Sequence, residues 1–197
     1  MTIHYHGTPI TPVKKIHALA GRHFCVSHAD PRNAEISHQI GQSVMLDNGA
    51  FSKWTKGKAI NWNGYYGWTE KWLAYPTTWA VIPDVIDGSE EENDVLLDCW
   101  PHGKNQAAPV WHLDESIKRL HRLIDSGYTK ICVGSSGQYK QVGSVLWHTK
   151  MIKAMNAICV NDQVPVWLHM LRGLSLSGSQ YPFSSLDSTD IARHHNE

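Results

Sequence analysis

The chain carries no net charge, because its 18 lysines and arginines balance 18 aspartates and glutamates. No overall electric field therefore attracts nucleic acid, and a nucleic-acid partner would need a local basic patch. Cysteine is scarce, and the four cysteines form no C-x-x-C pair: Cys25, Cys99, Cys132 and Cys159. This wide spacing argues against a disulfide framework and a zinc knuckle, and it favours a reduced, intracellular setting.

Long apolar segments are also missing. No apolar run approaches the ~20 residues of a membrane-spanning helix. The first six residues do not begin a charged region followed by an apolar stretch. We therefore expect no membrane partner, no signal peptide and a cytoplasmic location. The 197 residues suffice for one domain with a sizeable core.

Short apolar runs alternate along the chain with helix-like stretches. The expected strands are residues 3–6, 23–27, 44–47, 79–83, 108–112, 130–134, 164–168 and 182–186. Alternating strands and helices predict parallel pairing, because each strand needs a crossover to return. Eight units predict one α/β domain over residues 1–197, a compact (β/α)₈ TIM-like barrel. Since this fold usually takes roughly 250 residues, we expect shortened or irregular helices; a doubly wound open sheet is the alternative.

Three helix starts have recognisable signals. Thr11-Pro12 suits a cap followed by proline in the first turn. Ser89 with Glu92 has the spacing of a capping box. Asp114 is expected to cap the next helix.

Polar residues collect where the expected strands end. Three of them are acids that follow apolar runs: Asp47, Asp84 and Asp187. The others are His4, His6, Ser27, His28, His112, Gly134, Ser135 and His169. Parallel strands direct their carboxyl ends to one mouth, where barrel active sites are built. One such Asp is ordinarily a cap or turn residue, but three at matching positions predict that the acids point at one place.

Five segments stand in the order of the motifs of a known family. They are Asp47-Asn48-Gly49-Ala50-Phe51-Ser52, Ile82-Pro83-Asp84, Val133-Gly134-Ser135-Ser136-Gly137, His169-Met170-Leu171-Arg172-Gly173, and Ser185-Leu186-Asp187-Ser188-Thr189 followed by Ile191-Ala192-Arg193. They resemble the tRNA-guanine transglycosylases (queuine tRNA-ribosyltransferases) and their relatives that insert 7-deazaguanine bases into DNA. The last segment is most similar to the DNA-modifying, phage-borne branch. DNA is therefore favoured over tRNA as the partner, and the location would be the host cytoplasm if a phage encodes the chain.

The resemblance implies a transferase that replaces guanine by a 7-deazaguanine derivative. Asp187 would attack the sugar carbon and hold a covalent glycosyl intermediate. Asp47 would act as general acid and base on the departing and incoming bases. Asp84 would accept hydrogen bonds from the edge of the guanine ring. No metal and no cofactor is expected.

The remaining implied contacts surround the base and the nucleic-acid backbone. Backbone groups of Gly134 and Ser135 would approach the ring, and Phe51 and Met170 would sandwich it. The other expected base-binding residues are Asn48, Gly49, His112 and His169. Two arginines, Arg172 and Arg193, would contact phosphate. In duplex DNA the target base would first have to leave the stack, at a few kcal/mol.

The sequence also departs from the family. Asn48, Ala50 and Ser52 replace the Ser, Gly and Gln of the better-known motif, so we expect a different base preference. Because only ten residues follow Asp187, we expect the family's zinc subdomain, a Cys-x-Cys-x-x-Cys cluster with a distant His, to be missing. That subdomain helps the tRNA enzymes to dimerise, so the oligomeric state stays open.

Two other functions compete with base exchange. A metal-dependent hydrolase of the amidohydrolase type could place ligands at His4, His6, His112 and Asp187. Against it, the sixth expected strand ends in Gly134, where that type supplies another His. A binding module without catalysis is the second competitor, and the presence of both Asp47 and Asp187 argues against it.

Overall fold

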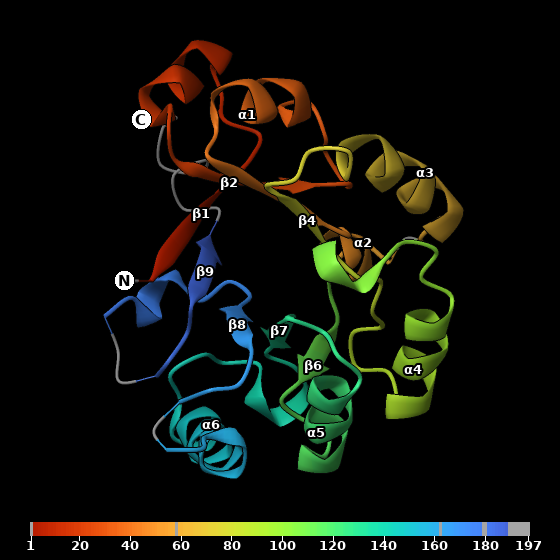
Figure 1. Cartoon of the computed structure of the whole chain (residues 1–197), viewed down its shortest axis with the longest axis vertical. Coiled ribbons are helices and arrows are strands. Elements are labelled where there is room, and N and C mark those ends of the chain that lie inside the picture. The colour runs from red at the N-terminus through yellow and green to blue at the C-terminus, as the bar shows by residue number, and fades with distance from the viewer. Residues whose placement is uncertain (1, 58, 162, 179–180, 189–197) are drawn as a thin grey trace.

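The computed structural model describes residues 2–57, 59–161, 163–178 and 181–188. Within them, parallel strands form a nearly closed barrel with the helices around its outside (Figure 1). The strand order is β5-β4-β3-β2-β1-β9-β8-β7-β6, and each neighbouring pair in it is parallel. The predicted TIM-like barrel is confirmed. None of the helices in these described ranges has the length and apolar character needed to cross a bilayer.

The strands are short and regularly spaced. They are β1 (Ile3–Gly7), β2 (His23–Ser27), β3 (Ser43–Asp47), β4 (Thr78–Val81), β5 (Ala107–Ala108), β6 (Val110–His112), β7 (Lys130–Gly134), β8 (Trp167–Met170) and β9 (Ser185–Ser188). β9 lies beside β1, so the two ends of the described chain are neighbours in the sheet (Figure 1).

The helices are short, as expected for a lean barrel. The α-helices are α1 (Ala34–Ile40), α2 (Ala50–Trp54), α3 (Trp62–Trp72), α4 (Glu90–Asp98), α5 (Ile117–Asp125) and α6 (Val145–Ile158). The 3₁₀ turns are η1 (Val13–Leu19), η2 (Lys104–Gln106), η3 (Gly137–Tyr139) and η4 (Leu174–Leu176). The helix after Thr11-Pro12 is therefore a 3₁₀ helix, and the capping box of Ser89 with Glu92 is confirmed.

The cap predicted for α5 was wrong. The side chain that accepts a hydrogen bond from the first turn is Ser116, which receives it from the backbone N–H of Arg119 at 3.1 Å. Asp114 instead accepts a hydrogen bond from the Ser136 hydroxyl in the next loop. Both residues are good caps by type, so only the position at which the chain enters the helix distinguishes them.

The barrel closes at a strand that changes partner. β5 pairs with β4, β6 pairs with β7, and only Pro109 separates the two halves. A proline cannot donate to the ladder, but its carbonyl accepts from Cys132 N at 2.9 Å, while Ala108 O accepts from Ile82 N at 2.9 Å. The fifth expected strand is therefore one segment that joins both ends of the sheet.

The last two strands begin three residues later than expected. β8 starts at Trp167 and β9 at Ser185, whereas the apolar pattern placed their starts at residues 164 and 182. Pro165 and Pro182 lie in the expected ranges and cannot donate ladder hydrogen bonds. Both strands consequently extend further toward the mouth of the barrel than predicted.

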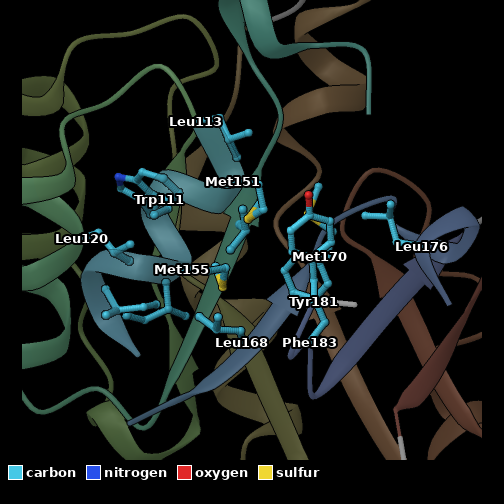
Figure 2. Close-up of a cluster of buried hydrophobic side chains, with 14 of the residues drawn as sticks. Trp111, Leu113, Leu120, Met151, Met155, Leu168, Met170, Leu176, Tyr181 and Phe183 are labelled. Carbon is cyan, nitrogen blue, oxygen red and sulfur yellow. The ribbon is translucent and has the colours of Figure 1, made fainter. Parts of the chain in front are cut away.

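Side chains alternate between the inside and the outside of the barrel. The interior holds a small cluster of residues from β1 to β7: Tyr5, Cys25, Met45, Trp79, Val81, Ala108, Val110 and Cys132. A larger cluster covers the outer face of β6 to β9 and packs against α5 and α6; Figure 2 shows Trp111, Leu120, Met151, Leu168 and Met170 within it. The polar side chain of His169 also lies in this interior, with its ring against those of Tyr5 and Trp79.

Tyr65 of α3 fixes the ends of β3 and β4 next to the mouth. Its buried hydroxyl donates to the carbonyl oxygen of Val81 at 2.6 Å and lies 3.2 Å from that of Leu46. Each of these carbonyls comes just before a strand-end segment that contains an acid. The helix thus sets where Asp47 and Asp84 leave the sheet.

We expect Tyr65→Phe to lower the free energy of unfolding by about 1–2 kcal/mol, because two buried carbonyls lose their hydroxyl partner. Urea denaturation measures this. Tyr66→Phe on the same helix is the matched control, and we expect a change within about 0.5 kcal/mol. Equal stability of the two variants would contradict the role of the Tyr65 hydroxyl.

Candidate active site

A cavity of about 290 Å³ opens at the carboxyl ends of the strands; we call it the central cavity. Its volume lies near the lower end of the range for small-molecule sites, roughly 300–1,000 Å³. Nine residues predicted from the sequence line it: Asp47, Asn48, Phe51, Asp84, His112, Gly134, Ser135, Arg172 and Asp187. The three acids therefore do converge on one place, delivered by the ends of β3, β4 and β9.

Asp47 is the acid whose proton affinity the protein changes most clearly. Its pKa is raised from 3.8 to about 6, mainly by burial and also by the nearby carboxylates of Asp187 and Asp84. Hydrogen bonds from the Ser27 side chain and from the Gly49 backbone N–H, the latter at 3.2 Å, oppose this shift. The carboxyl group can consequently exchange a proton near neutral pH.

Asp84 is held from both sides and is buried. Oδ1 accepts from Asn48 Nδ2 at 2.7 Å, and Oδ2 accepts from His112 Nε2 at 2.9 Å. Asn48 also donates to the carbonyl of Ile82 at 2.9 Å, so it ties the end of β3 to the segment after β4. Burial would lower the pKa of His112, but the hydrogen bond and charge of Asp84, with Glu115 and Asp114 nearby, raise it overall.

Asp187 presents one oxygen to the protein and the other to the cavity. Oδ1 accepts from the backbone N–H of Arg172 at 2.6 Å and from His169 Nε2 at 3.3 Å. Oδ2 receives no hydrogen bond from any residue within the described ranges. Asp187 lines the central cavity and is only 7 % exposed, so a carboxylate fixed at Oδ1 is next to whatever the cavity binds.

The direction of a hydrogen-bond chain fixes the tautomer of His169. Trp167 Nε1 can only donate, and it donates to Ser185 Oγ at 2.7 Å. The Asp187 carboxylate can only accept, so the ring proton that points at Oδ1 is on His169 Nε2. In the neutral ring, Nδ1 then accepts from the Ser185 hydroxyl, 2.8 Å away. All of this lies inside the barrel, beneath the cavity.

Arg172 lines the central cavity. Its guanidinium stacks 3.9 Å from the centroid of the Phe51 ring, and Nη2 donates to the carbonyl of Ser135 at 3.3 Å. Burial lowers its pKa, while the charges of Asp187, Asp47 and Asp84 oppose that shift. The guanidinium is thus the cation that partly balances the three carboxylates.

Two glycines have geometric reasons to be where they are. Gly49 has a left-handed φ of 78°, and a Cβ there would lie 3.0 Å from the backbone N of Ala29. A Cβ on Gly134 would lie 2.8 Å from His112 Nδ1. Gly134 therefore allows His112 to approach Asp84, and Gly49 makes the turn after Asp47 without lining the cavity.

Besides Gly49, two further predicted base-binding residues do not line the cavity. Met170 is fully buried in the outer cluster between the sheet and α6 (Figure 2), so it is not placed to cover a ring in the cavity. His169 is fully buried behind Asp187 and does not line the cavity. The strand runs on through Met170, and Leu171 and Arg172 reach the cavity instead. Arg193 lies outside the described residues.

Of the four ligands expected for the metal-dependent hydrolase, His112 and Asp187 line the central cavity, but His4 and His6 do not. Tyr5 points into the barrel, where its ring meets Trp79 and His169, so its strand neighbours His4 and His6 point outward. His4 Nε2 lies 2.7 Å from the Ser177 hydroxyl. Over the ranges that the structure describes, no group of three or more His, Cys, Asp or Glu is arranged to hold a metal ion.

Sequence reasoning missed several residues of the site. Lys56 lines the central cavity, Ser27 binds Asp47, and Trp167 with Ser185 orients His169. Ser27 was already among the polar residues expected at the strand ends, and its contact with Asp47 could have been predicted, because it ends β2 beside Asp47 in the sheet register. Ser185 could also have been found, since it lies two residues before Asp187 and so faces the same side of the strand.

We expect Asp47→Asn to stabilise the protein at neutral pH. A pKa raised from 3.8 to about 6 means that the unfolded chain ionises first, so the folded state loses stability as pH rises through this window. The variant lacks this penalty, which reaches about 3 kcal/mol when the pH is above the pKa of Asp47 in both the folded and the unfolded state. Its unfolding free energy should match the wild type near pH 4 and exceed it above pH 7, in urea titrations.

The exposed Asp125→Asn is the control for this pH series. It should follow the wild type within about 0.5 kcal/mol at every pH. A wild-type protein that is as stable as Asp47→Asn at pH 8 would show that Asp47 is not desolvated.

The tautomer of His169 can be measured directly. Long-range ¹⁵N–¹H correlation spectra should show an unprotonated Nδ1 and a protonated Nε2. In Ser185→Ala the Nδ1 acceptor loses its donor, so the tautomer preference should weaken or disappear. A protonated Nδ1 in the wild type would refute the direction assigned to the chain.

Comparisons with protein-family models, with curated proteins and with solved structures find no match to this chain. What the site does must therefore be argued from its geometry.

Proposed function

We propose that this chain is a transglycosylase that replaces guanine in nucleic acid, with DNA favoured, by a 7-deazaguanine derivative. The observation that supports this function most is the convergence of Asp47, Asp84 and Asp187 on one cavity of about 290 Å³. The three acids differ in their partners, which suits three different tasks. Their order along the chain is also the order in which the resembling family uses them.

Asp187 is the proposed nucleophile. Its Oδ1 is fixed by the Arg172 N–H and by His169 Nε2, which leaves Oδ2 to attack the sugar. The bond from sugar C1′ to the guanine nitrogen breaks as the C1′–Oδ2 bond forms, and the electron pair of the broken bond stays with the ring. Two displacements at the same carbon retain the configuration of the sugar.

Asp47 is the proposed proton carrier. Its pKa of about 6 lets it hold a proton in the resting site and give it to the departing guanine ring. The resulting carboxylate then takes a proton from the incoming base as that base attacks C1′. The C1′–Oδ2 bond breaks, its electron pair returns to Asp187, and both acids are back in their starting states.

Asp84 is the proposed reader of the base edge. Each carboxylate oxygen can accept more than one hydrogen bond, so the bonds from Asn48 and His112 leave capacity for a ring N–H and an amino group. The raised pKa of His112 keeps a donor on Asp84. Gly134 and Ser135 complete the wall on this side, and the stacked pair of Phe51 and Arg172 closes the other.

The proposal predicts a covalent intermediate. Single-stranded DNA that is incubated with the wild-type protein should give a protein–DNA adduct on denaturing gels, and labelled guanine should enter the DNA. Asp187→Asn should abolish both, a loss of at least about 10³-fold, while folding as the wild type does because a carboxylate at the cavity contributes little to the core.

The exposed Asp125→Asn is again the control, and it should exchange guanine at the wild-type rate. Exchange by Asp187→Asn at a normal rate would remove the nucleophile assignment. Nucleoside mass spectrometry of DNA from cells that are supplied with 7-deazaguanine bases then identifies which base is inserted.

A further inference from the structure

A second cavity of about 260 Å³ lies directly beside the central cavity. The two share a wall formed by Ala50, Asp84 and Ile86. Trp54, Ile60, Trp62 and Val85 complete the second cavity. None of these four residues touches the proposed reaction, so the second cavity is a separate compartment one wall away from the base-binding site.

The lining of the second cavity suits a flat, apolar ring. Two tryptophans and three aliphatic side chains form most of it. Among the residues that the structure describes, Asp84 is the charged one in its lining, and its oxygens already bind Asn48 and His112. Tryptophan faces bind nucleobases by stacking, irrespective of base identity. A charged or strongly polar ligand would find few partners here.

Exposed aromatic side chains connect the central cavity with the surface. Trp54 is 49 % exposed and Phe51 is 39 % exposed, and their ring centroids are 5.9 Å apart with an angle of 33° between the planes. On the inner side, the Arg172 guanidinium stacks on Phe51. Large aromatic side chains this exposed add nothing to the core, which makes a ligand-binding role the better explanation.

Positive charge accompanies these rings. Lys53 and Lys56 belong to the same short segment, and Lys56 lines the central cavity. In a chain with no net charge, two lysines in the same segment as two exposed aromatic rings form the local combination that binds single strands: rings stack on bases and ammonium groups contact the phosphates. Together, the second cavity and these lysines match one nucleotide next to the reacting one.

We propose that the second cavity is a subsite for the nucleobase adjacent to the target base in a single-stranded nucleic acid, with the intervening phosphate on Lys56. This subsite extends the proposed function, because it assumes that the central cavity takes the target base. In this proposal Lys56, and not Arg172, contacts the phosphate. A free base or nucleoside would not fill it, so the preferred substrate is a strand of at least two nucleotides.

The test uses the full chain with Asp187→Asn, which prevents turnover, and a fluorescent single-stranded DNA oligonucleotide with one guanine. Fluorescence anisotropy compares the intact strand with strands that carry an abasic position on either side of that guanine. The loss of stacking at the subsite should weaken binding about tenfold for one of the two neighbours. Trp54→Ala should weaken binding of the intact strand by the same factor. The affinity of this variant should not fall further when the neighbouring position is abasic.

Tyr75→Ala removes another exposed aromatic ring, outside both cavities, and is the matched control. It should keep the wild-type response to the abasic position. Lys56→Ala should also weaken the intact strand and reduce the salt dependence of its affinity. Because Trp54 and Lys56 are exposed, neither variant should affect folding, which circular dichroism checks.

The subsite is refuted if Trp54→Ala binds the intact strand as the wild type does. It is also refuted if the losses of binding free energy caused by Trp54→Ala and by the abasic neighbour are additive when the two are combined. A failure of the proposed reaction looks different: no adduct and no guanine incorporation would occur, yet the coupling between Trp54 and the neighbouring base would persist. Exchange that proceeds normally in Trp54→Ala with unchanged affinity for the strand would remove the subsite and leave the reaction.

Discussion

Three carboxylates crowd into one desolvated cavity, and the rest of the site is arranged around that constraint. Like charges that share a site cannot all be ionised without a penalty, so the protein either raises a pKa or supplies donors. Asp47 shows the first solution, with a pKa of about 6. Asp84 and Asp187 show the second, because each accepts two hydrogen bonds from the surrounding protein.

The donors come from different parts of the fold, which explains why the barrel must be nearly closed. Asp84 depends on Asn48 after β3 and on His112 at the end of β6, while Asp187 depends on β8 and the loop that follows it. Pro109 lets one segment pair with β4 and then with β7, and so brings β6 within reach of the β4 end. An open sheet with the same strands would leave the two sides of the cavity apart.

The sequence was sufficient to predict the barrel and most of the site, because both depend on local signals. Apolar runs mark the strands, and the residue that follows each run marks the mouth. One error came where a strand ends two residues later than its apolar run indicates. The expected strand 164–168 ended before Met170, which was then free to cover a base; in the structure β8 includes it and directs it outward.

The polar interior could not be predicted for a related reason. A tryptophan such as Trp167 is an ordinary core residue by composition, and only three-dimensional pairing shows that its N–H binds Ser185, which contacts His169 in turn. Likewise, the sequence alone indicates only that Arg172 is basic. In the structure its φ is left-handed at 56°, its backbone N–H binds Asp187, and its guanidinium lies over the Phe51 ring. Such contacts depend on residues far apart in the sequence.

The segment after β3 concentrates the features that would decide which base is accepted. Asn48 positions Asp84, Phe51 supports Arg172, and Ala50 and Trp54 form walls of the second cavity. None of the four belongs to the cluster inside the barrel. Changes in this segment can therefore alter recognition without disturbing the strands that hold the acids. This is the physical reason to expect that the departures from the family's motif, at Asn48 and Ala50, affect base preference and leave the reaction itself intact.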